Sequence, residues 1–474
     1  MPGPLTPTSA QVKPPDSTTA SGVSIVRLPA TPGQNSATDS RSSTFYFHSV
    51  PAATMGVPTA PEAPACNHGT MSGAALKKLA AASVPAALFT TGLLLLATGL
   101  LSRDSALELA ARTAPILLFV AAMTIVTELA DNAGLFSFLT ARLARAGART
   151  GQSGARLGRV IFLWLLVVAL AALSTVFLSL DTTAVLVTPV VVALARHARI
   201  HPLPFALTTV WLANTASLLL PVSNLSNLLA QQQMGVAPVE FARLLWAPAL
   251  VGLLAPLAFL FVIFRRDLRG RYAAPQVPEV VDKRLLLLSG ATVALLLPAL
   301  VSGIPVAIPA VAAAVFLVLV FVLRNRSALR WRMVPFQPLL LAMGLFLLVA
   351  TLHDHGLGAA LARFSGSGND FLSLLRLSGL GVLSANAVNN LPAYLALEPV
   401  AGSQLRLAAL LIGVNLGPLL APWASLATLL WHSRLKSMGI TISWTGYALA
   451  GLGLLAVLIP GAVLALWLTA GMPG

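Results

Sequence analysis

Apolar segments long enough to cross a lipid bilayer follow one another along most of this chain. Runs rich in leucine, alanine, valine and phenylalanine recur between residues 82 and 469, and about 20 such residues span the hydrocarbon core as a helix. Only 9% of the 474 residues are charged, whereas 57% are hydrophobic. A soluble protein of this length needs more charge to cover its surface, so the sequence predicts an all-α polytopic membrane protein.

The charged residues are mostly basic, with a formal net charge of +15. The arginines gather in short segments between the apolar runs, which is the distribution expected of cytoplasmic loops rather than of a nucleic-acid-binding patch. The single cysteine, Cys66, lies before the first apolar run, so the sequence holds neither a disulfide framework nor a CxxC metal site. We expect no metal, no cofactor and no nucleic-acid partner.

The first 72 residues are rich in proline, serine, threonine, alanine and glycine and show no apolar periodicity. This composition predicts a disordered tail, and the tail lacks the basic-then-apolar order of a signal peptide. We place it in the cytoplasm, ahead of a membrane domain over residues 75–470. The alternative is that the native chain starts at Met71, where an apolar segment opens with two nearby lysines.

Placing the basic loops in the cytoplasm sets the order of the membrane segments and predicts about 10–11 transmembrane helices. The basic segment 134–159 repeats leucine and phenylalanine near helical spacing, which suits an amphipathic interfacial helix or a plain basic loop. Residues 353–370 are expected to form a loop on the outside. The expected spans, two of them interrupted, are 82–101, 107–129, 204–231, 245–264, 285–302, 305–323, 335–352, 407–436 and 445–469.

Two further apolar blocks are interrupted by polar residues. Residues 160–198 are too long for one span and contain the sequence SLDTT, which places Asp181 inside a hydrophobic run. Basic residues flank both ends of this block, so both ends belong in the cytoplasm and the block is predicted to be a re-entrant hairpin. A second block, 371–398, contains LSANAVNNLPAYL and enters from the opposite side by the same reasoning.

The two interrupted spans resemble each other. The sequence NTASLLLPVSNLSNLL aligns with NLGPLLAPWASLATLL, which matches Asn214 to Asn415 and Pro221 to Pro422. Proline removes a helical hydrogen bond and small polar side chains can satisfy the freed backbone groups. Each span is therefore predicted to be a broken helix.

The order of hairpin, broken helix and closing span occurs twice, which predicts two inverted repeats at about 107–264 and 305–469. Inverted repeats with paired interrupted segments are typical of secondary transporters whose binding site lies near the middle of the membrane. The alternative from another class is a channel or an inactive scaffold with two proline-kinked helices.

The interrupted segments also resemble those of a known family, the arsenite efflux permeases or arsenical pump membrane proteins. That family belongs to an ion-transporter superfamily that includes sodium/proton antiporters and citrate and dicarboxylate carriers. The resemblance covers residues 75–470. It is carried by ELADNAGLF (128–136), DTTAVLVTP (181–189), ANTASLLLPVSNLSNLL (213–229), NNLP (389–392) and NLGPLLAPWASLATLLW (415–431).

The resemblance implies a polar site where the two hairpin tips meet beside the two breaks. This chain departs from the family at Leu180, where asparagine often precedes the tip aspartate, and at Val414–Asn415, where Cys-Asp is frequent. The missing acid bears on ion coupling, and the missing thiol removes one soft ligand. The implied site residues are Asp181, Thr182, Thr183, Asn214, Thr215, Ser217, Ser223, Asn224, Asn389, Asn390, Asn415, Gly417 and Ser425.

The resemblance implies a secondary transporter that exports arsenite or antimonite and is coupled to the proton gradient. Near neutral pH arsenite is the uncharged acid As(OH)3, whose hydroxyls can hydrogen-bond to asparagine, serine and threonine. The alternative is a sodium- or proton-coupled carrier of anions such as citrate or dicarboxylates. Asp181 is interpreted either as the group that binds the coupling ion or proton, or as the N-cap of the helix that follows it.

No enzyme activity is expected. The sequence lacks a nucleotide-binding motif, and His353 and His355, in the expected outer loop, lack the ligand set of a metal site. The expected partners are the transported solute, a coupling ion (H+ or Na+) and the lipid bilayer of the plasma membrane. The resemblance adds a cytosolic ATPase subunit and a second copy of this chain, as a homodimer.

Overall fold

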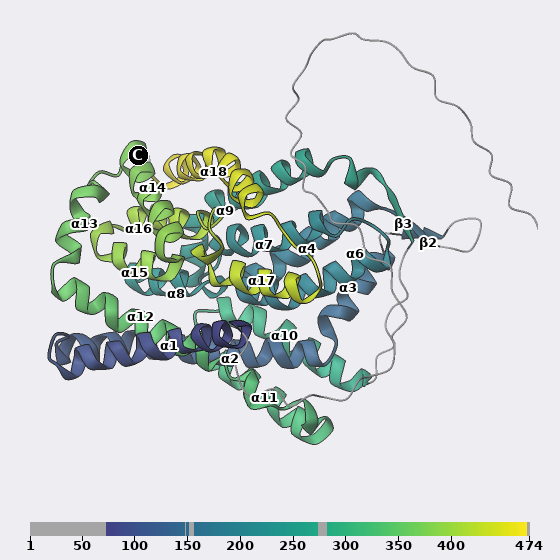
Figure 1. The fold of residues 1–474 in the computed structure, drawn as a ribbon, viewed down its shortest axis with the longest axis horizontal. Helices are drawn as coiled ribbons and strands as arrows, with labels where there is room; N and C mark the ends of the chain where they lie inside the picture. Colours follow the sequence, from purple (N-terminus) through teal and green to yellow (C-terminus); the bar gives the residue numbers. More distant parts are fainter. Residues whose placement is uncertain (1–72, 147, 151–155, 274–281, 472–474) are drawn as a thin grey trace, which may run out of the picture. The chain divides into compact units, whose positions relative to one another are not determined.

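The computed structural model describes residues 73–146, 148–150, 156–273 and 282–471 (Figure 1). All of the described residues belong to one compact unit. The predicted tail over residues 1–72, with Cys66 and the alternative start at Met71, lies outside the described residues.

Helices make up nearly all of the described secondary structure, which confirms the all-α prediction. Each element up to the middle of the chain is an α-helix unless marked otherwise. In order they are α1 (Gly73–Ala97), α2 (Arg103–Asn132), α3 (Leu135–Ala146), strands β1 (Ala148–Thr150) and β2 (Arg156–Arg159), α4 (Val160–Phe177), α5 (Leu180–Thr182), π-turn η1 (Thr183–Val187), α6 (Thr188–His197), α7 (Leu203–Thr215), 3-10 turns η2 (Ala216–Leu218) and η3 (Pro221–Ser223), α8 (Leu225–Met234), α9 (Pro238–Phe264), 3-10 turn η4 (Asp267–Arg269), strand β3 (Arg271–Ala273) and α10 (Lys283–Val301).

The remaining elements repeat much of this order. They are α11 (Ala307–Arg324), 3-10 turns η5 (Arg326–Ala328) and η6 (Trp331–Met333), α12 (Phe336–Asp354), α13 (Leu357–Ser365), α14 (Phe371–Val388), α15 (Asn390–Ala401), α16 (Gln404–Leu411), π-turn η7 (Ile412–Leu416), 3-10 turn η8 (Pro422–Ala424), α17 (Leu426–Ser437), α18 (Trp444–Leu466) and π-turn η9 (Trp467–Gly471).

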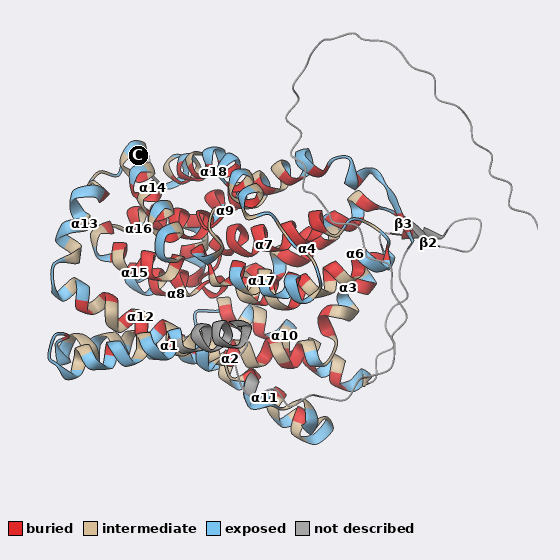
Figure 2. Cartoon of the chain, in the orientation of Figure 1, coloured by how far each residue is buried: buried red, intermediate tan, exposed pale blue. Residues whose placement is uncertain are grey.

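Nine helices in the described part of the chain are long and apolar enough to cross a membrane. Large hydrophobic side chains stay exposed along their outer faces, for example Leu295 in α10 and Val457 in α18. Such exposure is unfavourable in water and ordinary in lipid. Figure 2 shows the buried residues concentrated over α4, α7 and α16, whereas the outlying helices are largely exposed. The chain is a polytopic membrane protein, as predicted.

Both interrupted apolar blocks are hairpins. α4 is followed by a reversal at Ser179 (φ 148°), and α14 by a reversal at Asn389 (φ 130°). Thr183 Oγ1 donates to the carbonyl oxygen of Ala171 (3.4 Å), although twelve residues of straight helix would separate these residues by about 18 Å. α14 likewise packs against α15. The two tips share one backbone geometry, in which a residue that is not glycine adopts positive φ.

Both predicted broken helices are interrupted at matching positions. In each, a helix ends in an irregular turn, a 3-10 turn of three residues follows, and a second helix starts after one extended residue. That extended residue is Asn224 in the first (φ −151°, ψ 144°) and Ser425 in the second (φ −142°, ψ 140°). Pro221 and Pro422 each open the 3-10 turn, so the backbone confirms their alignment in sequence.

The correspondence between the two halves extends further than expected. α1 packs along α12, and α11 packs along α2. The first helix of each half therefore packs against the other half. Gly134 and Gly356, with φ of 83° and 92°, precede the short helices α3 and α13 at the same spacing after a long helix. We infer that the first copy begins at α1 rather than at residue 107, that the second begins at α11, and that α10 joins them.

Two connecting segments differ from their predictions. Residues 353–370, expected to be a loop, contain the helix α13, whose nine residues were too few for a clear helical pattern. The basic segment 134–159 forms α3 as one alternative predicted, and then the antiparallel pair β1–β2, to which β3 adds as a third strand. Tyr272 of β3 donates to the carbonyl oxygen of Ala144 (2.7 Å), and its burial raises the pKa of the phenol.

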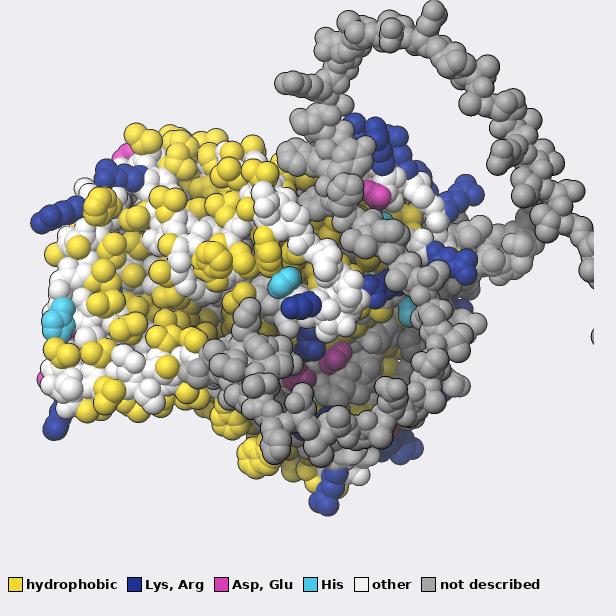
Figure 3. Space-filling model, viewed as in Figure 1, with side chains coloured by type: hydrophobic (Ala, Val, Ile, Leu, Met, Phe, Trp, Pro, Cys, Tyr) yellow, Lys and Arg dark blue, Asp and Glu magenta, His cyan; other side chains and the backbone are white. Residues whose placement is uncertain are grey.

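Most of the basic loops lie at one end of the helices. The three-stranded sheet joins the α3–α4 loop to the α9–α10 loop, Arg324 pairs with Asp282 across α10 and α11 (2.8 Å), and Arg196 donates to the carbonyl oxygen of Met438 (2.7 Å). The hydrogen bond from Arg324 holds the pKa of Asp282 below its usual value. Figure 3 shows many lysine and arginine side chains on the same side of the view as this sheet.

The helices fall into two groups by their packing. We call α1, α2, α10, α11 and α12 the peripheral group, because they pack mainly on one another, and the two hairpins, the two broken helices, α9 and α18 the central group. Figure 1 shows the peripheral group together along the lower part of the view. The main direct contacts between the groups are those of α2 with α8 and of α12 with α15.

Candidate functional site

The hairpin tips pack against the broken helices, as the repeats predict. α5, at the first tip, contacts α7 and α17, while α15, at the second tip, contacts α8 and η7. The helices α8, α15 and α17 and the segment that starts at Leu180 all begin in this region. Because a helix N-terminus carries partial positive charge, the region combines several such ends with the polar side chains of both breaks.

A network of amides joins the two broken helices to each other. Asn415 Oδ1, in the second break, accepts from Asn224 Nδ2 (3.0 Å) and from Ser226 Oγ (2.8 Å) in the first. Asn415 Nδ2 in turn donates to Asn227 Oδ1 (2.6 Å). One side chain of the second repeat therefore bonds three side chains of the first.

The same contact occurs a second time with the repeats exchanged. Asn214, which aligns with Asn415, donates from Nδ2 to Thr428 Oγ1 (3.2 Å) and to the carbonyl oxygen of Val210 (3.0 Å). Thr428 occupies the position in the second repeat that Asn227 holds in the first. The alignment found in the sequence is therefore also an alignment of contacts.

Several buried oxygen atoms in this region have no hydrogen-bond partner. Four of them belong to predicted site residues and are Asp181 Oδ1, Asn214 Oδ1, Thr215 Oγ1 and Ser425 Oγ. A buried polar group without a partner costs about 1–3 kcal/mol, and most such groups in native proteins are bonded. Carboxylate and amide oxygens accept, whereas hydroxyls both donate and accept, so this set suits a polar solute or a cation.

Other predicted residues hold the hairpin tip and the breaks in shape. Thr182 bonds Ser179 through both its backbone N–H and its hydroxyl (3.2 and 3.0 Å), and the hydroxyls of Thr183 and Thr175 lie 2.8 Å apart. Ser179 rather than Asp181 caps the following segment. The alternative in which Asp181 serves only as an N-cap therefore finds no support in this geometry.

Ser217 and Ser223 bond within their own turns. Each hydroxyl donates to the carbonyl oxygen three residues earlier, of Asn214 and Leu220 respectively, at 2.7 Å. Gly417 continues the second break, and a Cβ there would collide with the carbonyl oxygen of Gly413. These three residues shape the breaks rather than present free polar atoms.

The second tip bonds the second break. Asn389 Nδ2 donates to the carbonyl oxygen of Trp423 (2.8 Å), and the buried Asn390 accepts from the N–H of Leu391 (3.0 Å). Asn386 accepts from the backbone N–H groups of Leu420 and Ala421 (both 3.2 Å).

Asn386 was not among the predicted site residues. It also donates to the carbonyl oxygen of Gly417 (2.8 Å), so one side chain replaces several backbone bonds that the break removes. Asn227 does the same for the first break, since it donates to the carbonyl oxygens of Ser217 (2.7 Å) and Leu220 (3.0 Å). Both residues lie within the polar segments that interrupt the apolar runs, and this polarity is the feature of the sequence that could have identified them.

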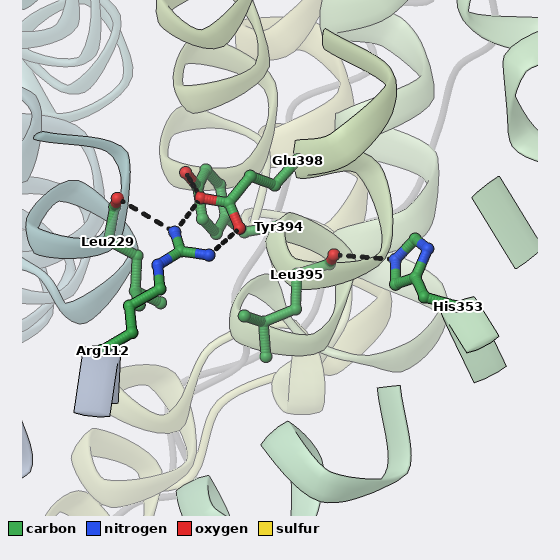
Figure 4. Close-up of polar contacts among 6 residues, drawn as sticks. All are labelled: Arg112, Leu229, His353, Tyr394, Leu395 and Glu398. Carbon is green, nitrogen blue, oxygen red and sulfur yellow. Dashed lines mark hydrogen bonds and ion pairs between the residues drawn. The ribbon is translucent and has the colours of Figure 1, made fainter. Parts of the chain in front are cut away.

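A second group that the sequence did not indicate surrounds Glu398 (Figure 4). This buried carboxylate of α15 accepts from Arg112 of α2, with Nη1 at 3.0 Å, and from the hydroxyl of Tyr394 at 2.7 Å. Arg112 Nη2 makes the second contact with Glu398 and also donates to the carbonyl oxygen of Leu229 (3.3 Å). The cluster is separate from the site and joins the peripheral group to the central group.

The histidines noted in the sequence bond backbone groups. His353 Nε2 donates to the carbonyl oxygen of Leu395 (3.2 Å), and the ring of His355 bonds the carbonyl oxygen of Thr351 (2.8 Å). Among the residues that the structure describes, no three His, Cys, Asp or Glu side chains gather where they could hold a metal ion.

Comparison with known proteins gives one family and a set of named relatives. Residues 74–428 match the citrate transporter family, CitMHS. The arsenical pump membrane protein of Escherichia coli K12 is 31% identical over 360 residues, and that of Yersinia enterocolitica 30% over 356 residues, each match covering 70% of this chain and 81% of the relative. The crystal structure of the Alcanivorax borkumensis YdaH transporter has a TM-score of 0.51 at 16% identity, covering 86% of this chain and 91% of that one. The likeness to YdaH concerns the fold alone.

Proposed function

Because this chain belongs to the citrate transporter family and to the arsenical pump membrane proteins, we propose that it is a secondary transporter that exports arsenite and antimonite. We further propose that export is driven by the proton gradient across the plasma membrane. The clustering of basic loops at one end of the helices supports a cytoplasmic position for that end and for the N-terminus.

The observation that carries the substrate proposal is the set of buried oxygens without partners. Asp181, Asn214, Thr215 and Ser425 offer acceptors and hydroxyls, and As(OH)3 presents three O–H donors and three oxygen acceptors. A neutral polyol of this kind can satisfy such groups without a charged side chain opposite it. The proposed ligands are these four residues, supported by the amide network of Asn415 and Asn224.

Asp181 is the proposed coupling group. As a carboxylate it can accept a hydrogen bond from a solute hydroxyl; once it is protonated, its O–H donates instead and the site loses that acceptor. A proton entering from the outside would therefore weaken solute binding, and solute binding from the cytoplasm would favour release of the proton. Such competition is reciprocal by thermodynamic linkage and yields exchange of a proton for the solute.

The second candidate function is coupled transport of an anion such as citrate or a dicarboxylate. The helix N-termini of α8, α15 and α17 near the site favour it, because backbone N–H groups at such ends bind carboxylates. The match of residues 74–428 to the citrate transporter family points the same way. A cytosolic ATPase on the basic loops and a homodimer are further proposals taken from the family resemblance.

Flux measurements decide between these functions. We expect everted membrane vesicles containing the chain to accumulate As(III) when energised, and a host lacking its own arsenite pump to gain resistance. Asp181→Asn should reduce gradient-driven accumulation at least about tenfold, because it removes the titrating group while keeping the side-chain volume. Asp267→Asn, an exposed carboxylate on η4, serves as the matched control and should leave transport unchanged.

Two results would contradict these proposals, the first for the substrate and the second for the coupling group. Citrate or dicarboxylate flux that is indifferent to arsenite would favour the second candidate. Export by Asp181→Asn at the rate of the unmodified chain, with the same dependence on the proton gradient, would remove Asp181 from coupling.

A further inference from the structure

The described residues contain two ion pairs, and they differ in what they connect. Arg324 and Asp282 pair between α11 and the start of α10, both in the peripheral group, and both side chains are partly exposed. Arg112 and Glu398 pair between α2 and α15, which belong to different groups. Only 5% of the Glu398 side chain is exposed, against 29% of Arg112, so the Glu398 carboxylate is shielded from water more fully than either partner of the other pair.

The Arg112 guanidinium binds two elements of the central group at once. It holds both carboxylate oxygens of Glu398 on α15 and the carbonyl oxygen of Leu229 on α8 (Figure 4). Tyr394, which lies on the same helix as Glu398, donates a further hydrogen bond from its hydroxyl to the carboxylate. The contact is therefore a polar junction between one peripheral helix, the second hairpin and the second half of the first broken helix.

A second polar contact reinforces this position. His353 of α12, also in the peripheral group, donates to the carbonyl oxygen of Leu395 in α15. Arg112 and His353 thus bind the same short helix from two peripheral helices, as Figure 4 shows. The contacts between α2 and α8 and between α12 and α15 are also the main direct contacts between the groups.

Stability alone is a poor reason for such a pair. Removing a carboxylate such as that of Glu398 from water is costly, and replacing a buried ion pair with apolar residues of similar size is often neutral or stabilising. The best-attested use of a buried charged pair is to select one arrangement among several. The Arg112–Glu398 pair joins the two groups beside one of their main direct contacts, that of α2 with α8, which fits that use.

We propose that the Arg112–Glu398 pair, with Tyr394, is a latch between the peripheral and central groups. It holds the arrangement seen here and must open when the second hairpin and α8 move relative to α2. This inference rests on the proposed transport function, since exposing the site alternately to the two sides of the membrane requires the two groups to move.

The ends of the helices place the latch on one side of the membrane. The pair lies towards the start of α2 and the end of α15, where Gln404 donates to the carbonyl oxygen of Met234 at the end of α8 (2.9 Å). Asp354, at the end of α12, meets Ser102 and Ser105 at the start of α2. This is the end opposite to the basic loops, so the latch closes the outer side.

The test compares distances between the groups with and without the latch. In a Cys66→Ser background, spin labels on Leu107→Cys (α2) and Leu372→Cys (α14), two exposed positions, report the relation of the groups. The triple variant Arg112→Met, Glu398→Met, Tyr394→Phe removes all three polar side chains, so none is left buried and unpaired. We expect it to add a second distance population, with a shift in the population ratio of about tenfold or more.

Two controls isolate the latch. Labels on Leu372→Cys and Val457→Cys, both in the central group, should keep one distance in the triple variant. Asp282→Asn with Arg324→Gln removes the ion pair that lies within the peripheral group and should leave the Leu107–Leu372 distance unchanged. An unaltered Leu107–Leu372 distribution in the folded triple variant would overturn the latch.

A second measurement tests the latch through export and does not depend on the triple variant. In the Cys66→Ser background, Arg112→Cys and Glu398→Cys are bridged by a bifunctional thiol reagent, and Met234→Cys with Gln404→Cys gives the matched bridge inside the central group. We expect the first bridge to stop export until it is reduced and the second to leave export intact. Export that continues through the first bridge overturns the latch, whereas absence of export by the unmodified chain rejects the proposed function and leaves the distance test to decide the latch.

Discussion

At the scale of single residues, Asn415 is the side chain on which the two repeats depend most. It accepts from two groups of the first repeat and donates to a third. We predict that Asn415→Ala lowers the free energy of unfolding by about 2–4 kcal/mol, because three buried polar groups lose a partner at once. Thermal or denaturant unfolding of the purified full chain in detergent measures the loss.

Ser223→Ala is the matched control for that change. Its hydroxyl is equally buried but bonds only the carbonyl oxygen of Leu220 in its own turn. We expect it to cost about 1 kcal/mol or less. Equal losses for the two variants would show that the contact between repeats adds nothing beyond a local hydrogen bond.

The residues that were predictable from sequence are those whose polarity breaks an apolar pattern. Asp181, Asn214 and Asn415 stand inside hydrophobic runs, and the structure places them on the tip and the breaks. Arg406 was not predictable. Its guanidinium donates to four carbonyl oxygens of residues 365, 366, 368 and 401, and no local spacing reveals that these distant ends meet at one side chain. Glu398 was missed for the same reason, because its partner Arg112 lies in another helix.

At the scale of elements, the closing helices α9 and α18 touch the breaks through glycine. A Cβ on Gly252 would lie 2.7 Å from the carbonyl oxygen of Thr215, and one on Gly451 would collide with that of Leu419. Small residues let membrane helices approach closely, here against backbone that has left the helix. We predict that Gly451→Ala lowers the unfolding midpoint and the yield of folded protein, because neither backbone can retreat without moving the break.

Gly379→Ala, in α14, separates crowding from helix propensity. A Cβ at Gly379 meets nothing within 4 Å, and alanine favours a helix by about 1 kcal/mol over glycine. We expect this variant to be as stable as the unmodified chain or more so, by the same unfolding measurement. A loss equal to that of Gly451→Ala would mean that the close approach of α18 to the break is unimportant.

Broken helices and hairpins were predictable at this scale because proline, asparagine and serine interrupt long apolar runs. The helix α13 and the three-stranded sheet were not, since their short sequences carry no distinctive period. The sequence also did not indicate that α1 packs on α12 of the second half and α11 on α2 of the first. Two uniformly apolar helices fit many partners equally well, and glycines such as Gly344 against α1 select among them only in three dimensions.

At the scale of the whole membrane unit, the second repeat is inverted relative to the first. The chain must therefore cross the membrane an odd number of times between a residue of the first repeat and the matching residue of the second. α11 provides a direct check, because its ends carry exposed serines. Ser302 precedes it, and Ser327 follows it beside the basic residues Arg324 and Arg326. We predict that, in a Cys66→Ser background, a membrane-impermeant thiol reagent labels Ser302→Cys in intact cells and Ser327→Cys only in everted vesicles.

The same reagents test the tips, where the consequence of inversion is greatest. A hairpin entering from the cytoplasm and one entering from outside bring Ser179 and Asn389 to one region from opposite sides. We expect labelling of Ser179→Cys to be faster from the cytoplasmic side than that of Asn389→Cys, and slower from the outside. If Ser302→Cys and Ser327→Cys reacted from the same side, α11 would not cross and the two halves would share one orientation. Their crossed contacts, Asn415 with Asn227 and Asn214 with Thr428, would then lack the symmetry that explains why both repeats break at the same place.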